Sequence, residues 1–242
     1  MIDLSQYDRV GSFFDGAAWV RKNGEEWHID KKGNPLYDER YDLVGNFNEG
    51  AARVFKDGKW WHIDKKGNAL YSERYKEVGI FYEGAAVVIK DRKYWHIDIN
   101  GNALYDEKYD LVGDFNEGAA WVRKNGEEWH IDINGSALYD ERYDLVGNFY
   151  EGAAWVRKNG EEWHIDINGS ALYSERYDLV GDFKDGAAWV RKNGEEWHID
   201  INGNALYDER HDSVGIFKDD VAWVRRNGEE WHINKKGERI ND

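Results

Sequence analysis

A 34-residue repeat constrains the fold of this chain more than any other feature of its sequence. The dipeptide Val-Gly recurs at a constant step of 34 residues, from Val10-Gly11 to Val214-Gly215, and Trp-His recurs at the same step. Such a period is typical of solenoids, propellers and other arrays of one structural unit. The sequence therefore predicts a single repeat domain over residues 1–242, made of seven units of 34 residues plus four residues of strand overlap.

Some of the repeats are nearly identical to one another. Segments 129–162 and 163–196 differ at only four pairs of positions, which are Asp140/Ser174, Asn148/Asp182, Tyr150/Lys184 and Glu151/Asp185. This degree of identity indicates recent amplification or consensus design. A designed repeat protein with no natural ligand is therefore one of the alternatives for this chain.

Each repeat carries a strong signal for a β-hairpin. In the first repeat, Asn23-Gly24 is the dipeptide that a type I′ turn requires, and strand-like runs flank it at 16–22 and 25–30. A two-residue turn fixes the cross-strand pairs. The expected pairs are Lys22 with Glu25, Arg21 with Glu26, Val20 with Trp27, Trp19 with His28, and Ala18 with Ile29.

The repeats themselves support this register. Where Arg21 is replaced by Phe55 in the second repeat, its partner is replaced by Trp60, and the third repeat has Ile89 and Tyr94 at these positions. A charged pair has thus been exchanged for an apolar pair twice, as expected for side chains in cross-strand contact.

The register assigns the side chains of a hairpin to two faces. The apolar face consists of Ala18, Val20, Trp27 and Ile29. The other face, called the mixed face below, consists of Ala17, Trp19, Arg21, Glu26, His28 and Asp30. Seven positions are apolar in every repeat and form the predicted core, namely those of Ala18, Val20, Trp27, Ile29, Leu36, Val44 and Phe47.

The fold class that follows is all-β, with three or four short antiparallel strands per repeat. Local hairpins exclude a parallel β-helix, which leaves a closed seven-bladed β-propeller or an open solenoid of stacked hairpins. Seven repeats lie within the usual range of propeller blades, and Ile2 and Ile240 place the two chain ends in the same strand phase. We therefore expect the closed propeller, with the open solenoid as the alternative.

The repeat resembles the bacterial WG-repeat (KWG) family. Residues 41–54 and the segment 63–67 fit the pattern Tyr-Asp-x-Val-Gly-x-Phe-x-Glu-Gly-x-Ala-x-Val and its Ile-Asp-Lys-x-Gly continuation. The position of the family's Trp is occupied by Trp60 in the second repeat but by Glu26 in the first. The resemblance implies a bacterial origin and a β-repeat scaffold, and it implies no catalytic residue.

A weaker resemblance concerns the choline-binding repeats of cell-wall proteins. Residues 121–126 and 129–132 are similar to the Trp-Val, Asn-Gly and Trp-Tyr hairpins of those repeats, whose period is shorter. This resemblance implies a module that binds glycans or cell walls through aromatic side chains.

Composition excludes several classes of partner. The formal net charge is -15, and no basic run follows the chain, so we expect no nucleic-acid binding. The longest apolar runs have four or five residues, whereas a membrane-spanning helix needs about 20. The chain has no cysteine, which leaves its redox compartment undetermined. Its first residues show no signal peptide, so we expect a cytoplasmic location by default.

Seven histidines at one repeat position suggest a metal site or a pH switch. Packed sheets lie about 10 Å apart, which separates such side chains too far to share one metal ion. We instead expect a structural hydrogen bond between His28 and Asp30, which lie two residues apart on the mixed face. The turn at 98–102 lacks the ligand spacing of a calcium loop. No metal or cofactor is therefore predicted.

The repeated tryptophans of the mixed face are the first candidate binding residues. An indole beside charged groups could form a sugar platform or a cation cage, and the structural alternative is packing against the neighbouring repeat. These residues are Trp19, Trp121, Trp155, Trp189 and Trp223.

The second candidate surface lies where the repeats differ most. In repeats two and three the mixed face becomes aromatic and aliphatic, with the composition of an interface hot spot. The alternative is that this face is buried between repeats. Its residues are Arg53, Phe55, Trp60, Val87, Ile89 and Tyr94.

No nucleophile–base spacing or phosphate-binding loop occurs in the sequence. The function predicted from sequence is therefore a non-enzymatic, monomeric scaffold for a protein partner. The alternative is a glycan or cell-wall-binding module that uses tryptophan platforms.

Overall fold

The computed structural model describes residues 3–240, and its regular secondary structure consists of β-strands. Each repeat begins with a two-residue strand and continues with a hairpin. The two-residue strands are β1 (Arg9–Val10), β4 (Leu43–Val44), β7 (Glu77–Val78), β10 (Leu111–Val112), β13 (Leu145–Val146), β16 (Leu179–Val180) and β19 (Ser213–Val214). Repeats are numbered 1 to 7 below, each counted from this strand.

The hairpins contain the longer strands. Their first strands are β2 (Ala17–Lys22), β5 (Ala52–Lys56), β8 (Ala86–Lys90), β11 (Ala120–Lys124), β14 (Ala154–Lys158), β17 (Ala188–Lys192) and β20 (Val221–Arg226). Their second strands are β3 (Glu25–Asp30), β6 (Lys59–Ile63), β9 (Lys93–Ile97), β12 (Glu127–Ile131), β15 (Glu161–Ile165), β18 (Glu195–Ile199) and β21 (Glu229–Asn234). A final strand, β22 (Arg239–Ile240), pairs with β21.

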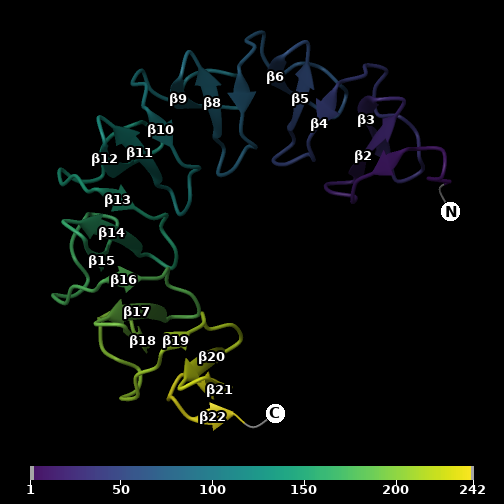
Figure 1. Ribbon diagram of the computed structural model, residues 1–242. Helices are drawn as coiled ribbons and strands as arrows, with labels where there is room; N and C mark the ends of the chain where they lie inside the picture. Colours follow the sequence, from purple (N-terminus) through teal and green to yellow (C-terminus); the bar gives the residue numbers. More distant parts are fainter. Residues whose placement is uncertain (1–2, 241–242) are drawn as a thin grey trace. The chain divides into compact units, whose positions relative to one another are not determined.

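The chain forms two compact units, whose boundary falls between Phe115 and Asn116. The first unit contains the antiparallel sheets β1-β2-β3, β4-β5-β6 and β7-β8-β9 (Figure 1). The second contains the hairpin β11-β12, the sheets β13-β14-β15 and β16-β17-β18, and the four-stranded sheet β19-β20-β21-β22. The all-β prediction is confirmed, with three strands as the usual number. Ile2 lies outside the described residues.

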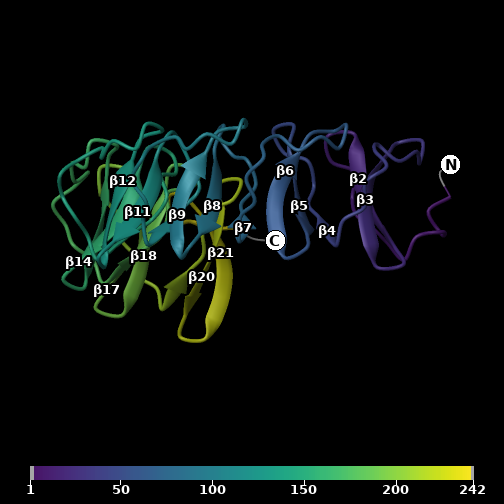
Figure 2. The ribbon, with the colours of Figure 1, turned by 90° about the horizontal axis from the view of Figure 1, so that it is seen from above.

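The predicted hairpin register is confirmed. In repeat 1, all five expected pairs of β2 and β3 are present, and the two strands run side by side (Figure 2). Asn23 and Gly24 have φ angles of 53° and 86°, which are the left-handed conformations that a type I′ turn needs. The exchanged pairs also lie opposite each other, Phe55 with Trp60 and Ile89 with Tyr94.

The core of each repeat lies on the apolar face of its hairpin. Ala18, Val20 and Ile29 are fully buried, as are their equivalents in the other repeats. Leu36, which the sequence placed in the core, is only partly buried. The adjacent Tyr37 takes the buried position instead, because its ring packs edge-on against both His28 and Tyr41.

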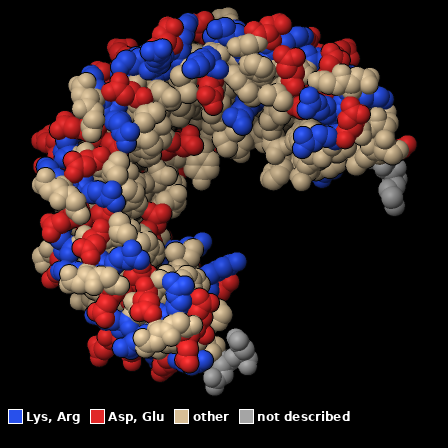
Figure 3. Space-filling model, viewed as in Figure 1, with Lys and Arg blue, Asp and Glu red and all other residues tan. Residues whose placement is uncertain are grey.

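The mixed face is also largely covered within each unit. Glu26 and His28 are buried because the first strand of the next repeat packs over them. On the face shown in Figure 3, acidic and basic side chains are interspersed with neutral ones. Residues 3–240 contain no helix with the length and apolar character that crossing a membrane requires.

Candidate functional site in the grooves between repeats

The repeated histidines join each repeat to the next. His28 Nε2 lies 2.8 Å from the carbonyl oxygen of Gly45, and Nδ1 lies 2.6 Å from the Tyr37 hydroxyl. A carbonyl only accepts hydrogen bonds, so Nε2 carries the proton and the Tyr37 hydroxyl donates to Nδ1. Burial lowers the pKa of His28 to about 4, which keeps the ring neutral. The same arrangement recurs at His62, His96, His130, His164 and His198.

The predicted hydrogen bond between His28 and Asp30 is wrong. The Asp30 carboxylate accepts the backbone N–H groups of Lys32 and Asn34 and stabilises its own turn. The histidines are therefore structural. Among the described residues, no group of three or more His, Asp or Glu side chains is arranged to hold a metal ion.

A charged pair forms a second link between repeats. Glu162 Oε1 accepts Arg157 Nε at 2.7 Å, and its Oε2 accepts the backbone N–H of Val180, in the first strand of repeat 6, at 2.7 Å. Glu162 is buried, so both oxygens need these partners. Glu128 and Glu196 make the corresponding bonds in repeats 4 and 6.

Repeats 2 and 3 replace this pair with rings and aliphatic groups. The Phe55 and Trp60 rings have centroids 5.0 Å apart, and the Arg53 guanidinium lies 5.4 Å from the centre of the Trp60 ring. Trp60 packs against the buried cluster that contains Val78 and Phe81 of repeat 3.

All six residues of the second candidate surface are half-buried, and Trp60 and Arg53 contact the next repeat. These residues are Arg53, Phe55, Trp60, Val87, Ile89 and Tyr94. The structure thus places part of this surface at contacts between repeats, which was the alternative interpretation.

The repeated tryptophans lie across the Val-Gly dipeptides. A Cβ atom added to Gly147 would stand 2.1 Å from Trp155 Nε1, and one added to Gly181 would stand 2.0 Å from Trp189 Nε1. Glycine is required there because the indole occupies the space of a side chain. Trp19, Trp121, Trp155 and Trp189 remain partly accessible, and Trp223 of repeat 7 is 42% exposed.

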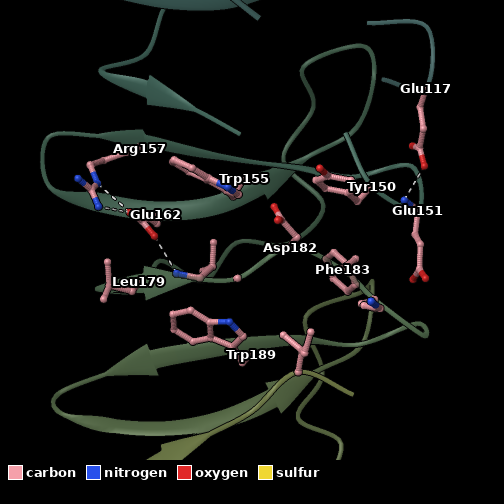
Figure 4. Close-up of a pocket in the computed structure, with 14 residues that line it drawn as sticks. Glu117, Tyr150, Glu151, Trp155, Arg157, Glu162, Leu179, Asp182, Phe183 and Trp189 are labelled. Atoms are coloured by element: carbon pink, nitrogen blue, oxygen red, sulfur yellow. Dashed lines mark hydrogen bonds and ion pairs between the residues drawn. The ribbon is translucent and has the colours of Figure 1, made fainter. Parts of the chain in front are cut away.

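A groove of about 850 Å³ lies between repeats 5 and 6 (Figure 4). Its apolar lining consists of Tyr150, Trp155, Leu179, Val180, Gly181, Phe183, Trp189 and Ile216, and its charged lining consists of Glu117, Glu151, Arg157, Glu162, Asp182 and Lys184. A smaller groove of about 390 Å³ lies between repeats 4 and 5. Tyr150, Trp155 and Asp182 line both grooves.

Most acidic side chains of the larger groove are already engaged. Glu117 accepts the backbone N–H groups of Glu151 and Gly152, and Glu151 accepts those of Asp185 and Gly186. Within the described part of the chain, the carboxylate of Asp182 has neither a hydrogen bond nor an ion pair. The residue is exposed, and desolvation by the surrounding groove raises the pKa of its carboxyl above the ordinary value.

Family comparison agrees with this repeat architecture. The model of the WG containing repeat matches residues 2–25, 29–60, 63–94, 97–127, 131–161 and 165–195. The chain belongs to the WG-repeat family. No curated protein is similar enough in sequence to match it.

A solved structure of another protein shows that the fold of this WG-repeat protein occurs elsewhere. A eukaryotic initiation factor is 11% identical, with a TM-score of 0.58 over 97% of this chain and 75% of the other. Hsv2 of Kluyveromyces lactis is 8% identical, with a TM-score of 0.46 over 86% of each chain. The first of these similarities shows a shared fold alone.

Part of the groove lining coincides with residues singled out in the sequence. Trp155 and Trp189 were among the predicted binding residues, whereas Tyr150 and Asp182 were not singled out. The signal for them was present, because both belong to the few differences between segments 129–162 and 163–196.

Proposed function

We propose that this WG-repeat protein is a non-enzymatic scaffold that binds a protein partner through the grooves between its repeats. One observation carries the proposal. Of the four differences between segments 129–162 and 163–196, three fall at positions that line these grooves: Asn148/Asp182, Tyr150/Lys184 and Glu151/Asp185. Almost all other positions of the two segments are identical, whereas positions that line the grooves vary. This pattern is found in repeat proteins that bind along a surface of variable side chains.

The chemistry of the groove supports binding over catalysis. Among the residues that line it there is no Ser, Thr, Cys or His, so it lacks the side chains of a hydroxyl or thiol nucleophile activated by histidine. Glu162 is held by Arg157 and a backbone N–H, so it is poorly placed to transfer protons.

A glycan-binding function is the second candidate. Trp155 and Trp189 both line the groove, and indole rings beside a free carboxylate suit sugar rings and their hydroxyl groups. The protein partner is preferred because the groove is continuous with exposed apolar side chains, Tyr150 at 40% and Ile216 at 52% exposure.

The experiment compares a groove variant with a control outside the groove. Peptides are selected by phage display on the wild-type protein, and glycans are tested on an array. Tyr150→Asn with Asp182→Asn converts the groove to the residue types of Asn116 and Asn148, which earlier repeats carry. The control, Asp140→Ser, copies Ser174 at an exposed site outside both grooves.

We expect at least tenfold weaker peptide binding by the groove variant and unchanged binding by the control. Peptides that bind the groove variant as tightly as the wild-type protein would contradict the proposal. Glycan binding that is lost on Trp155→Ala, without any peptide binding, would favour the second function.

A closed seven-bladed ring is part of the same proposal. Within the units, each histidine stacks on the phenylalanine of the next repeat: His28 and Phe47 have ring centroids 4.5 Å apart, and Phe47 is 3% exposed. In contrast, His232 of repeat 7 and Phe13 of repeat 1 are both exposed. Each terminal repeat therefore presents the group that the other would cover in a closed ring.

Crosslinking tests this closure, because the chain contains no native cysteine. Phe13→Cys with His232→Cys is treated with a short bismaleimide and compared with each single variant. We expect an internal crosslink in the double variant. Crosslinks between molecules would indicate head-to-tail association, and the absence of either product would favour the open solenoid.

A further inference from the structure

The residues shared by the two grooves have complementary chemistry. Tyr150, Trp155 and Asp182 line both cavities, and their side chains lie around the same part of the groove in Figure 4. Asp182 is exposed at the rim of both grooves, and within residues 3–240 its carboxylate has neither a hydrogen bond nor an ion pair. An accessible carboxylate without a protein partner can pair with a cation that enters the groove, so this part of the groove favours a positively charged ligand.

The aromatic neighbours favour the same kind of ligand. The faces of indole and phenol rings attract cations, and an ammonium group beside a ring and a carboxylate gains from both. The larger groove also has four acidic side chains (Glu117, Glu151, Glu162 and Asp182) against two basic ones (Arg157 and Lys184). Arg157 is already paired with Glu162. The groove is thus net negative.

This combination occurs at one boundary in the repeat array. The boundary between repeats 4 and 5 carries Trp121, Asn116 and Asn148 at the corresponding positions. At the boundary between repeats 6 and 7, the positions equivalent to Tyr150 and Asp182 are occupied by Lys184 and Ile216. The boundary between repeats 3 and 4 has Tyr82 and Asp114 at these positions but Val87 in place of the indole. The combination of the carboxylate with both rings is therefore found at repeats 5 and 6 and does not follow from the repeat itself.

We propose that the groove between repeats 5 and 6 binds the ammonium group of a lysine side chain, with Asp182 as its counter-ion and Trp155 and Tyr150 as the rings beside it. The inference rests on the proposed scaffold function and names the chemistry that the partner presents. A cavity of about 850 Å³ exceeds one side chain, so it also accommodates the residues that flank the lysine.

The test uses three amide-capped probes: acetyl-lysine amide with its ε-amine free, its trimethylated form, and acetyl-norleucine amide, which lacks the charge. Binding is followed by NMR through the indole N–H of Trp155 and the backbone N–H of Asp182. We expect saturable shifts with both charged probes and none with norleucine. Asp182→Asn, which copies repeat 5, should weaken binding at least tenfold, and Tyr150→Asn should weaken it severalfold.

Equal binding of norleucine, or unchanged binding by Asp182→Asn with an intact fold in circular dichroism, would overturn the inference. The peptides selected for the scaffold test separate the two proposals. If those peptides need the groove but tolerate replacement of every lysine by norleucine, the lysine inference fails and the scaffold stands. If a selected peptide binds no more tightly than acetyl-lysine amide, the ligand is a small cation and the scaffold proposal fails instead.

Discussion

The contact between repeats 5 and 6 is built from charges, whereas the contact between repeats 2 and 3 is built from aromatic rings. At the same positions of the hairpin, one has Arg157 and Glu162, and the other has Phe55 and Trp60. The backbone pairing around them is the same. Both contacts also retain the histidine that bonds a tyrosine and a glycine carbonyl, His164 in one and His62 in the other.

This difference distinguishes the residues that both contacts share from the cross-strand pair, which varies. The histidine, its tyrosine and the two-residue turn are present at both contacts, so they fix the distance and angle between repeats. The cross-strand pair is interchangeable, provided that both members change together, because a single exchange would leave a buried charge without a partner.

Acid should unfold both regions alike, because they share the histidine. Burial lowers the pKa of His62 and of His164 from 6.5 to about 4. The unfolded state therefore binds more protons between these values. The resulting stability is fully present above pH 6.5 and decreases as the pH falls toward 4. Each histidine contributes on the order of 3 kcal/mol.

Six such histidines exceed the total stability of a typical domain, so we expect unfolding before pH 4 is reached. The measurement is the free energy of unfolding in denaturant from pH 7 to pH 4. His232→Gln is the control and should leave the profile unchanged, since His232 is exposed. A flat profile between pH 6.5 and 4.5 would contradict the buried histidine network.

Removing Glu162 should be costly at the charged contact. Glu162→Ala leaves the Val180 N–H without its acceptor and Arg157 without its partner, so we expect a loss of about 2–4 kcal/mol in the free energy of unfolding. Glu230→Ala is the matched control in repeat 7. The Glu230 side chain is 64% exposed, and this change should cost less than about 0.5 kcal/mol. Equal losses would mean that Glu162 does not join the repeats.

Replacing the glycine of the Val-Gly dipeptide with alanine should destabilise the two regions to different extents. Gly147→Ala places a methyl group where the Trp155 indole lies, and the displaced ring should cost about 1–3 kcal/mol. Gly79→Ala meets Val87 atoms no nearer than 3.4 Å, because repeat 3 has a valine in place of the indole, and this change should be nearly neutral. Thermal unfolding of both variants checks the comparison.

The sequence predicted the hairpins better than the contacts between them. The Asn-Gly turn and the paired exchanges of Phe55 and Trp60 define the register, because both act through residues close in the chain. Asp30 was wrongly predicted as the hydrogen-bond partner of His28. The actual partner, Tyr37, lies in an irregular segment whose direction no periodic sequence pattern indicates. Asp182 was not singled out for a related reason: its position in the grooves depends on how neighbouring repeats pack.

The smallest effect expected is the coupling within the aromatic pair. Trp60→Glu alone places a carboxylate against Phe55 and removes ring packing onto repeat 3, so it should destabilise the protein. Adding Phe55→Arg recreates the pair found at Arg157 and Glu162 and should recover part of the loss. Cross-strand pairs contribute about 0.2–1 kcal/mol, so the coupling free energy from a double-mutant cycle should lie at the upper end of this range. Strictly additive losses would show that residues 55 and 60 are not energetically coupled and that the cross-strand pair cannot be exchanged as a unit.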